Sequence, residues 1–197
     1  GNAELVAAVR SDSLDYWRKD AKRNLPELEK TLSERHERAG ELAYLLEPDL
    51  KEARGGLRDI QALRAISLSG AVQVPLEKIS WAESTLNNVR EALHTASGRG
   101  KDRLLFQEQD KVAKILNYKD ADGMMSDVAR AARTVDYLLD YTWHALEHKG
   151  KDGLGRIMRR PRVVNVAKNV SAVEREIIID SLTSFNEDPV VGLRAAA

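Results

Sequence analysis

Apolar residues recur at helical spacing along most of the chain. In the strongest pattern, Val128, Ala132, Val135, Leu139 and Leu146 fall on one face of a helix. Because consecutive amphipathic helices bury their apolar faces against one another, we predict a mainly α fold, a helical bundle of about six helices. The shorter stretches with the same spacing are residues 14–21, 25–39, 57–69, 79–93 and 112–116.

Glycine and proline mark where several of these helices begin and end. Gly40 and Gly70 each follow the last apolar residue of a periodic stretch, as is common at helix C-termini. Pro26 and Pro75 lie near the starts of two stretches, and proline is tolerated in the first turn of a helix. The pattern predicts that one helix starts or kinks at Pro26 and that another begins at Pro75.

The pattern changes after residue 148. Residues 149–162 are rich in glycine and basic side chains, which predicts a solvated linker. The runs 162–166 and 176–179 are rich in β-branched residues and predict a short β-hairpin or a pair of edge strands. Residues 188–197 resemble the start of a helix that leads into a further domain. The predicted domains are the helical bundle, 1–148, and the basic linker, hairpin and lead-in, 149–197.

Charge and composition narrow the choice of partners. The 197 residues include 31 basic and 31 acidic side chains, and the resulting net charge of zero gives no general attraction to nucleic acid or to an anionic membrane. No apolar run approaches the roughly 20 residues needed to span a bilayer. Cysteine is absent, which is compatible with a reducing cytoplasm. We therefore expect a cytoplasmic protein with neither a nucleic-acid nor a membrane partner.

The segment 47–61, with the sequence EPDLKEARGGLRDIQ, concentrates charge around a glycine pair. Glycines can adopt a positive φ or allow another backbone to come close, and helical spacing starts directly after this pair. A helix start offers free N–H groups and a partial positive charge, which suit a phosphate or a carboxylate. The alternative is a sharp turn whose charges are solvated. The candidate binding residues at this turn are Lys51, Glu52, Gly55, Gly56, Arg58 and Asp59.

A second group of candidates follows in residues 90–103. Arg90 and His94 are four residues apart and therefore share a helix face, and a glycine loop at 98–100 returns the chain toward the same end. The arginines could clamp a phosphate, or they could buttress the turn through Asp59 and Asp102. The candidate residues of this group are Arg90, His94, Arg99 and Arg103.

A stripe on the last predicted helix has the spacing of metal ligands. Asp140, His144 and His148 recur every four residues, so their side chains could stack on one face. No further ligand is evident in the sequence. We therefore favour a solvated stripe beside the apolar face and expect no metal site in this chain.

Two segments resemble the PII uridylyltransferase/uridylyl-removing enzyme family. LLEPDLKEARGGLRDIQALR is similar to the family signature Glu-Pro-Asn/Asp-x-Lys-Glu-Gly-Pro-Gly-Gly-Leu-Arg-Asp-Ile, and it departs from that signature at Ala53-Arg54, where the family has Gly-Pro. VREALHTASGRGKDRLLFQEQDKVAKIL is similar to a second family segment, and the tail DPVVGLRAAA is a weaker match. The resemblance covers the chain from about Leu32 onward.

The resemblance implies a role within a larger enzyme. In this family a helical domain lies between a nucleotidyltransferase domain and an HD hydrolase domain. The parent enzyme transfers a nucleotidyl group from UTP, or from ATP in some relatives, to a tyrosine of the signalling protein PII in response to glutamine status, and it also removes the group. The implied partners are PII, the nucleotide and the two flanking domains, and Mg²⁺ is implied for the parent but not for this segment. Its start, Gly1-Asn2-Ala3, has no initiator methionine and could be a tag remnant, so we hypothesise an excised segment of a longer protein.

The catalytic residues that the family needs are absent from this sequence. Nucleotidyl transfer requires a Gly-Ser turn followed by an Asp-x-Asp pair that holds magnesium, and the hydrolase requires adjacent His and Asp ligands. The chain has no Gly-Ser turn, and none of its four histidines is followed by aspartate. We therefore expect no catalytic residue in this segment and no activity from it alone.

Two other functions remain open at this point. The related glutamine synthetase adenylyltransferase carries a Gly-Gly-Ile-Arg-Asp-Ile-Glu-Phe run, but here Gln61-Ala62 replaces Glu-Phe, which argues against it. A non-catalytic helical interaction scaffold is the other alternative. Such a scaffold would show no nucleotide-dependent change in stability.

Overall fold

The computed structural model describes residues 2–151, 163–167, 170–173 and 176–179. The chain divides into two compact units, Gly1–Lys151 and Asp152–Ala197. The greater part of the predicted linker and the predicted C-terminal lead-in lie outside the described residues.

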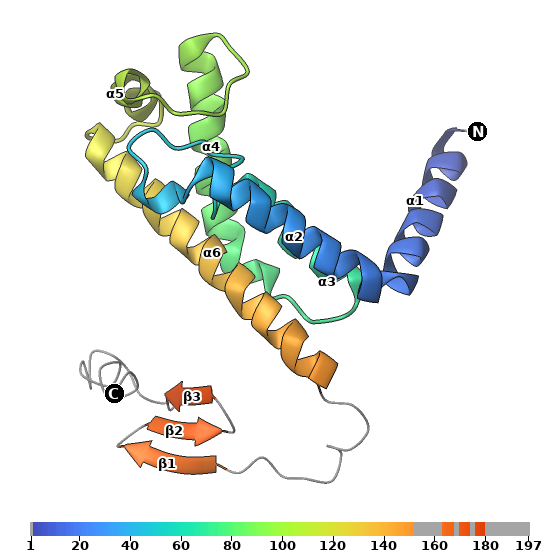
Figure 1. The fold of residues 1–197 in the computed structure, drawn as a ribbon. Helices are drawn as coiled ribbons and strands as arrows, with labels where there is room; N and C mark the ends of the chain where they lie inside the picture. Colours follow the sequence, from blue (N-terminus) through green and yellow to red (C-terminus); the bar gives the residue numbers. More distant parts are fainter. Residues whose placement is uncertain (1, 152–162, 168–169, 174–175, 180–197) are drawn as a thin grey trace. The chain divides into compact units, whose positions relative to one another are not determined.

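The first unit is helical, as the apolar spacing predicts. Within residues 2–151 six α-helices are described, and two short 3₁₀ helices, η1 (Leu42–Tyr44) and η2 (Leu76–Ile79), precede α3 and α4 (Figure 1). None of the described helices is long and apolar enough to cross a membrane. The helices are α1 (Asn2–Lys19), α2 (Ala21–Ala39), α3 (Leu57–Ser69), α4 (Ser80–Ser97), α5 (Phe106–Ile115) and α6 (Ala121–Lys151).

Helix α6 forms the centre of the core. Its apolar stripe is buried as the sequence predicts, with Val128 and Val135 fully inaccessible to solvent. Helix α4 packs against α6 through Leu86 and Val89, and α3 adds Leu63 to the same core. Burial of each such side chain is worth roughly 1.5–3 kcal/mol, so this stripe holds α3, α4 and α6 together.

The glycines mark helix ends more accurately than the prolines mark helix starts. Gly40 and Gly70 follow the last residues of α2 and α3, as predicted. Pro26 lies inside α2, which begins earlier, at Ala21, where the carbonyl of Asp20 accepts N–H groups of the first turn. Pro75 precedes the short helix η2, and α4 begins only at Ser80.

The second unit contains three described strands in one antiparallel sheet. Strands β1 (Val163–Ala167), β2 (Val170–Val173) and β3 (Glu176–Ile179) follow each other in the order β1-β2-β3. The predicted hairpin between the first and last of these runs is wrong, because each of them pairs with β2 instead. Strands that are adjacent in sequence usually pair with each other, and the central strand was not recognised from the sequence.

Candidate functional site

The two segments that carry the family resemblance lie against each other. The N–H of Leu104 donates to the carbonyl of Pro48 at 2.9 Å, and the N–H of Leu50 donates to the carbonyl of Asp102 at 2.9 Å. A short antiparallel bridge joins Asp49 to Arg103 between these two bonds. The loop before α3 and the loop after α4 therefore form one continuous piece of structure.

The glycine pair allows this loop to pack directly on α6. Gly55 has a φ of +83°, and a Cβ atom at this position would lie 2.5 Å from the carbonyl oxygen of Ala132. A Cβ at Gly56 would lie 2.7 Å from the carbonyl oxygen of Ala53. Both glycines are thus explained by close backbone approach, which a side chain would prevent.

The start of α3 does not offer free N–H groups. The N–H of Leu57 donates to the carbonyl of Leu50 at 3.0 Å, and the N–H of Arg58 donates to the carbonyl of Lys51 at 3.1 Å. The expectation of free N–H groups at this helix start is therefore wrong, because the preceding loop folds back and supplies its own carbonyl oxygens to satisfy the donors.

Asp59 is the buried anchor of the turn. Its carboxylate accepts hydrogen bonds from the guanidinium of Arg35 and from the N–H of Gly55 at 2.6 Å, and His36 Nε2 lies 2.9 Å from the same carboxylate. Burial acts to raise the pKa of Asp59, but the hydrogen bond with His36 and the charge of Arg35 outweigh it and hold that pKa below its usual value. Asp59 thus faces the protein interior.

Asp102, at the edge of the turn, is a second carboxylate surrounded by basic side chains. Arg90 Nε donates to Asp102 Oδ1 at 2.6 Å, His94 Nε2 lies 2.9 Å from the same oxygen, and Lys51 Nζ lies 3.7 Å from Oδ2. Burial acts to raise the pKa of Asp102, and the hydrogen bonds from Arg90 and His94 outweigh it and lower that pKa. The structure therefore brings three sequence candidates, Lys51, Arg90 and His94, together around one carboxylate.

The remaining candidates lie near the surface. Arg58 Nε is 3.3 Å from Glu52 Oε1, and about half of the Arg58 side chain is exposed. Arg103 Nη2 is 3.8 Å from Glu47 Oε2 rather than near Asp102. Arg99 is exposed, and its side chain has no partner in the part of the chain that the structure describes. Arg99 and Arg103 thus form no described contact with the Asp102 cluster.

Arg54 ties the turn to α6. Its Nε donates to Asp136 Oδ1 at 2.6 Å, and its Nη2 donates to Asp140 Oδ2 at 2.9 Å. The hydrogen bond to Asp136 raises the pKa of Arg54, and partial burial together with the like charge of Asp136 raises the pKa of Asp140. Within the described residues, no three His, Cys, Asp or Glu side chains are grouped so that they could hold a metal ion, and the side chain of His148 lies outside them.

Sequence reasoning missed the partners of these candidates. Arg35 and His36 lie 24 and 23 residues before Asp59, and no local pattern links them to it. One signal was present in the sequence, because His36 follows Leu28 and Leu32 at intervals of four residues and so lies on the apolar face of its helix, where a polar residue needs a buried partner. Arg54 and Asp136 are separated by 82 residues, which no local pattern could reveal.

Two hollows flank the turn. A groove of about 460 Å³ runs between α2 and α3, and Arg38, Glu52 and Arg58 lie at its mouth; we call it the α2–α3 groove. A second hollow of about 520 Å³ shares Arg38 and Glu52 with this groove and also contains Glu47 and Arg103. The half-buried Glu52 and the exposed Arg58 and Arg103 therefore border concave surface.

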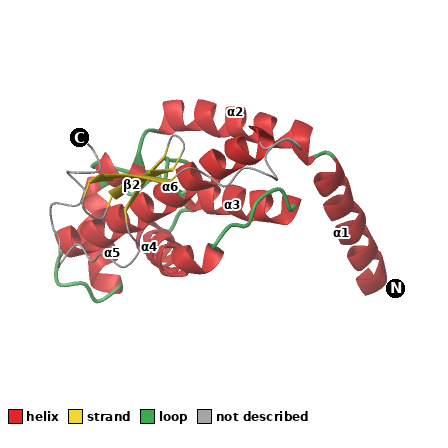
Figure 2. Cartoon of the chain, turned by 90° about the horizontal axis from the view of Figure 1, so that it is seen from below, coloured by secondary structure: helices red, strands yellow, loops and turns green. Residues whose placement is uncertain are grey.

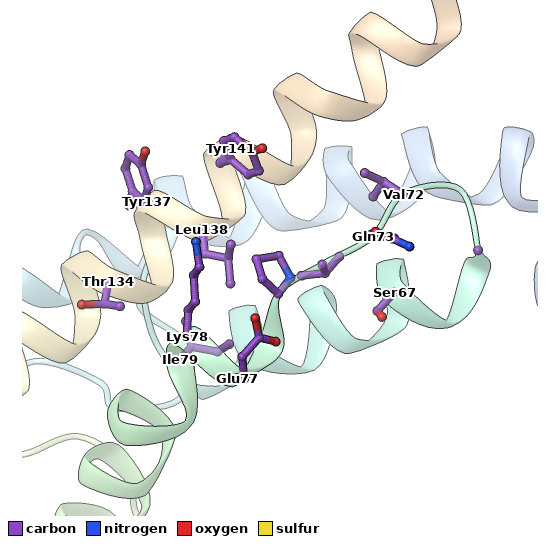
Figure 3. Close-up of a pocket in the computed structure, with 13 residues that line it drawn as sticks. Ser67, Val72, Gln73, Glu77, Lys78, Ile79, Thr134, Tyr137, Leu138 and Tyr141 are labelled. Atoms are coloured by element: carbon purple, nitrogen blue, oxygen red, sulfur yellow. The ribbon is translucent and has the colours of Figure 1, made fainter. Parts of the chain in front are cut away.

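A larger cleft of about 830 Å³ lies away from the turn, between the end of α3, segment 72–79 and α6. Tyr137 and Tyr141 of α6 form one side of it, and Val72 and Gln73 lie opposite them (Figure 3). Lys78 is exposed at this cleft and has no side-chain partner among the described residues. The cleft contains none of the candidates that the sequence predicts.

Comparison with known proteins identifies related sequences. The family model described as GlnD PII-uridylyltransferase matches residues 23–69 and 74–143, which include the loop before α3 and the loop after α4. A bifunctional uridylyltransferase/uridylyl-removing enzyme of Streptomyces coelicolor is 41% identical and covers 100% of this chain, which spans 25% of that protein. The enzyme with the same description from Mycobacterium tuberculosis H37Rv is 31% identical, again over 100% of this chain and 26% of its own length. No solved structure matches the chain.

Proposed function

The chain belongs to the GlnD PII-uridylyltransferase family, and we propose that it is the helical domain of a bifunctional uridylyltransferase/uridylyl-removing enzyme. The chain spans about a quarter of the length of the curated relatives it matches. In this proposal the nucleotidyltransferase and HD domains flank the chain in a cytoplasmic enzyme. That enzyme transfers a nucleotidyl group from UTP or ATP to a tyrosine of PII and removes it again as nitrogen status changes.

The proposed role of this domain is to pack on the nucleotidyltransferase domain and complete its active site. The observation that supports this role is the gathering of Lys51, Arg90 and His94 around Asp102. About a third of the side chain of Lys51 and of Arg90 remains exposed, so their outer donors can reach a further group. Two permanent cations against one carboxylate leave an excess of positive charge, which suits the phosphates of a nucleotide.

In the proposed reaction, the residues of this chain bind and orient the nucleotide. Asp102 holds the two cations in place, and the Asp59 anchor fixes the turn that carries Lys51. Such prearranged donors cost little reorganisation when a phosphate arrives. Mg²⁺ is proposed only for the nucleotidyltransferase domain of the parent enzyme, where it would neutralise phosphate charge.

The test uses the full-length enzyme that carries this chain. We expect Lys51→Ala and Arg90→Ala each to lower kcat/KM for UTP about tenfold or more, because each variant removes a charge-assisted hydrogen bond to phosphate. Transfer to PII is followed by the mass of the modified protein, with UTP and ATP compared as donors. Arg64→Ala is the matched control, since Arg64 is an exposed arginine of α3 that pairs with Glu83 at 2.7 Å.

The possible results separate the domain's role from its family membership. If the two variants melt like the wild type and keep full kcat/KM, the cluster serves only to shape the turn. If the wild-type enzyme fails to modify PII with either nucleotide, the proposed function itself is wrong.

A further inference from the structure

The α2–α3 groove has an apolar floor made by small and aliphatic side chains. Leu28 and Leu32 come from α2, and Ala62 and Ala65 come from α3, which lies beside α2 in both views (Figures 1 and 2). The two alanines leave room between the helices, which produces a groove of about 460 Å³. Such a floor fits one or two aliphatic side chains.

The mouth of the groove has an excess of positive charge. Arg38 is exposed and has no side-chain partner among the described residues. Arg58 pairs with Glu52 at 3.3 Å, and both side chains are well exposed, so this pair is weak. Arg35 also lines the groove, but Asp59 compensates its charge. Arg38 and Arg58 thus both face the groove, and only the carboxylate of Glu52 balances their charge there.

The lining indicates which kind of partner fits. The described residues that line the groove include no aromatic side chain, so a nucleobase would find no surface on which to stack. The apolar floor is small and its rim is charged, which is typical of a transient contact rather than a permanent interface between domains. The adjoining hollow has three carboxylates, those of Glu47, Asp49 and Glu52, against the arginines Arg38 and Arg103, so it attracts an acidic segment less than the groove does.

We propose that the α2–α3 groove docks an acidic, amphipathic segment of the enzyme's protein substrate. An aliphatic side chain of this segment lies on the floor formed by Leu32, Ala62 and Ala65, and a neighbouring carboxylate pairs with Arg38 and Arg58. The inference rests on the proposed function, which makes PII the substrate. The groove is separate from the Asp102 cluster, which is proposed to serve the nucleotide.

The test measures KM for PII and KM for UTP separately in the full-length enzyme. We expect Arg38→Glu to raise KM for PII about tenfold and to weaken its dependence on salt, because charge at the rim steers association. KM for UTP should stay unchanged, and the melting temperature should fall only slightly, because Arg38 is exposed but lies in the last turn of α2, where a cation is favoured. Arg38→Lys should keep most of the affinity. Lys78→Glu is the matched control, because it reverses an exposed charge at the other cleft.

The results distinguish this inference from the function on which it rests. If wild-type enzyme modifies PII and Arg38→Glu leaves KM for PII unchanged, the groove does not dock the substrate and the proposed function stands. A rise in KM for UTP instead would overturn the inference in favour of a nucleotide site. If the wild type does not modify PII, both the function and the inference fail.

Discussion

The carboxylate of Asp59 accepts a hydrogen bond of 2.6 Å from the backbone N–H of Gly55, four residues earlier. This contact closes the turn on itself, and the same carboxylate binds Arg35 of α2. One buried side chain thus fixes the geometry of the loop and its position against a second helix. The turn depends on this carboxylate because Arg35 would otherwise be a buried charge without compensation.

We expect Asp59→Asn to destabilise the fold by about 3–5 kcal/mol, the usual cost when one partner of a buried ion pair is removed. The amide keeps the shape of the side chain but cannot compensate the charge of Arg35. Urea unfolding of the chain, followed by far-ultraviolet circular dichroism, measures the change in the free energy of unfolding. Asp110→Asn, at an exposed position of α5, is the control and should change that free energy little. Equal stabilities of the two variants would contradict the anchoring role of Asp59.

The sequence predicts the local features of this turn but not its contacts with distant residues. The glycine pair and the stripe of α6 are local patterns, so both were found from the sequence, as was the helical fold. The partners of Asp59 are on another helix, and the chain's own carbonyl oxygens at Leu50 and Lys51 occupy the N–H groups that were expected to be free. Such contacts depend on how the loop folds back, which helical spacing does not encode.

Acid should reduce the stability that Asp102 contributes to the fold. The pKa of Asp102 is lower in the folded state than its ordinary value, so the unfolded chain takes up the proton first as the pH falls. The stability contributed by Asp102 is therefore present above its ordinary pKa of about 4 and is lost as the pH falls through the lower, folded value.

This pH effect is measured as a difference between two proteins. We expect the free energy of unfolding of Asp102→Asn to fall less steeply between about pH 5 and pH 2 than that of the wild type, because the titrating carboxylate is gone. Urea unfolding at several pH values gives both curves. Asp140, whose pKa is raised, acts in the opposite direction and is present in both proteins. Parallel curves would show that Asp102 contributes no pH-dependent stability.

The close approach of Gly55 to α6 predicts a position-specific cost of substitution. We expect Gly55→Ala to destabilise the chain by more than about 2 kcal/mol, because the strain of a positive φ adds to a clash with the carbonyl oxygen of Ala132. Gly70 provides the matched control, since its φ of +72° is similar but no atom lies within 4 Å of an added Cβ. Gly70→Ala should therefore cost only about 1–2 kcal/mol, the conformational part alone. Equal losses in thermal unfolding would mean that Gly55 does not pack against α6.

The link between Arg54 and α6 is the last feature that can be isolated by substitution. Arg54→Ala should destabilise the fold by about 1–2 kcal/mol, because it removes the charge-assisted hydrogen bonds to both carboxylates and leaves Asp136 and Asp140 to repel each other. In a double-mutant cycle with Asp136→Ala, we expect a coupling energy of about 1 kcal/mol from urea unfolding. The same cycle with Asp140→Ala should give a smaller value, because the Asp140 side chain is 64% exposed against 29% for Asp136. Additive losses for Arg54 and Asp136 would show that this ion pair does not hold the turn on α6.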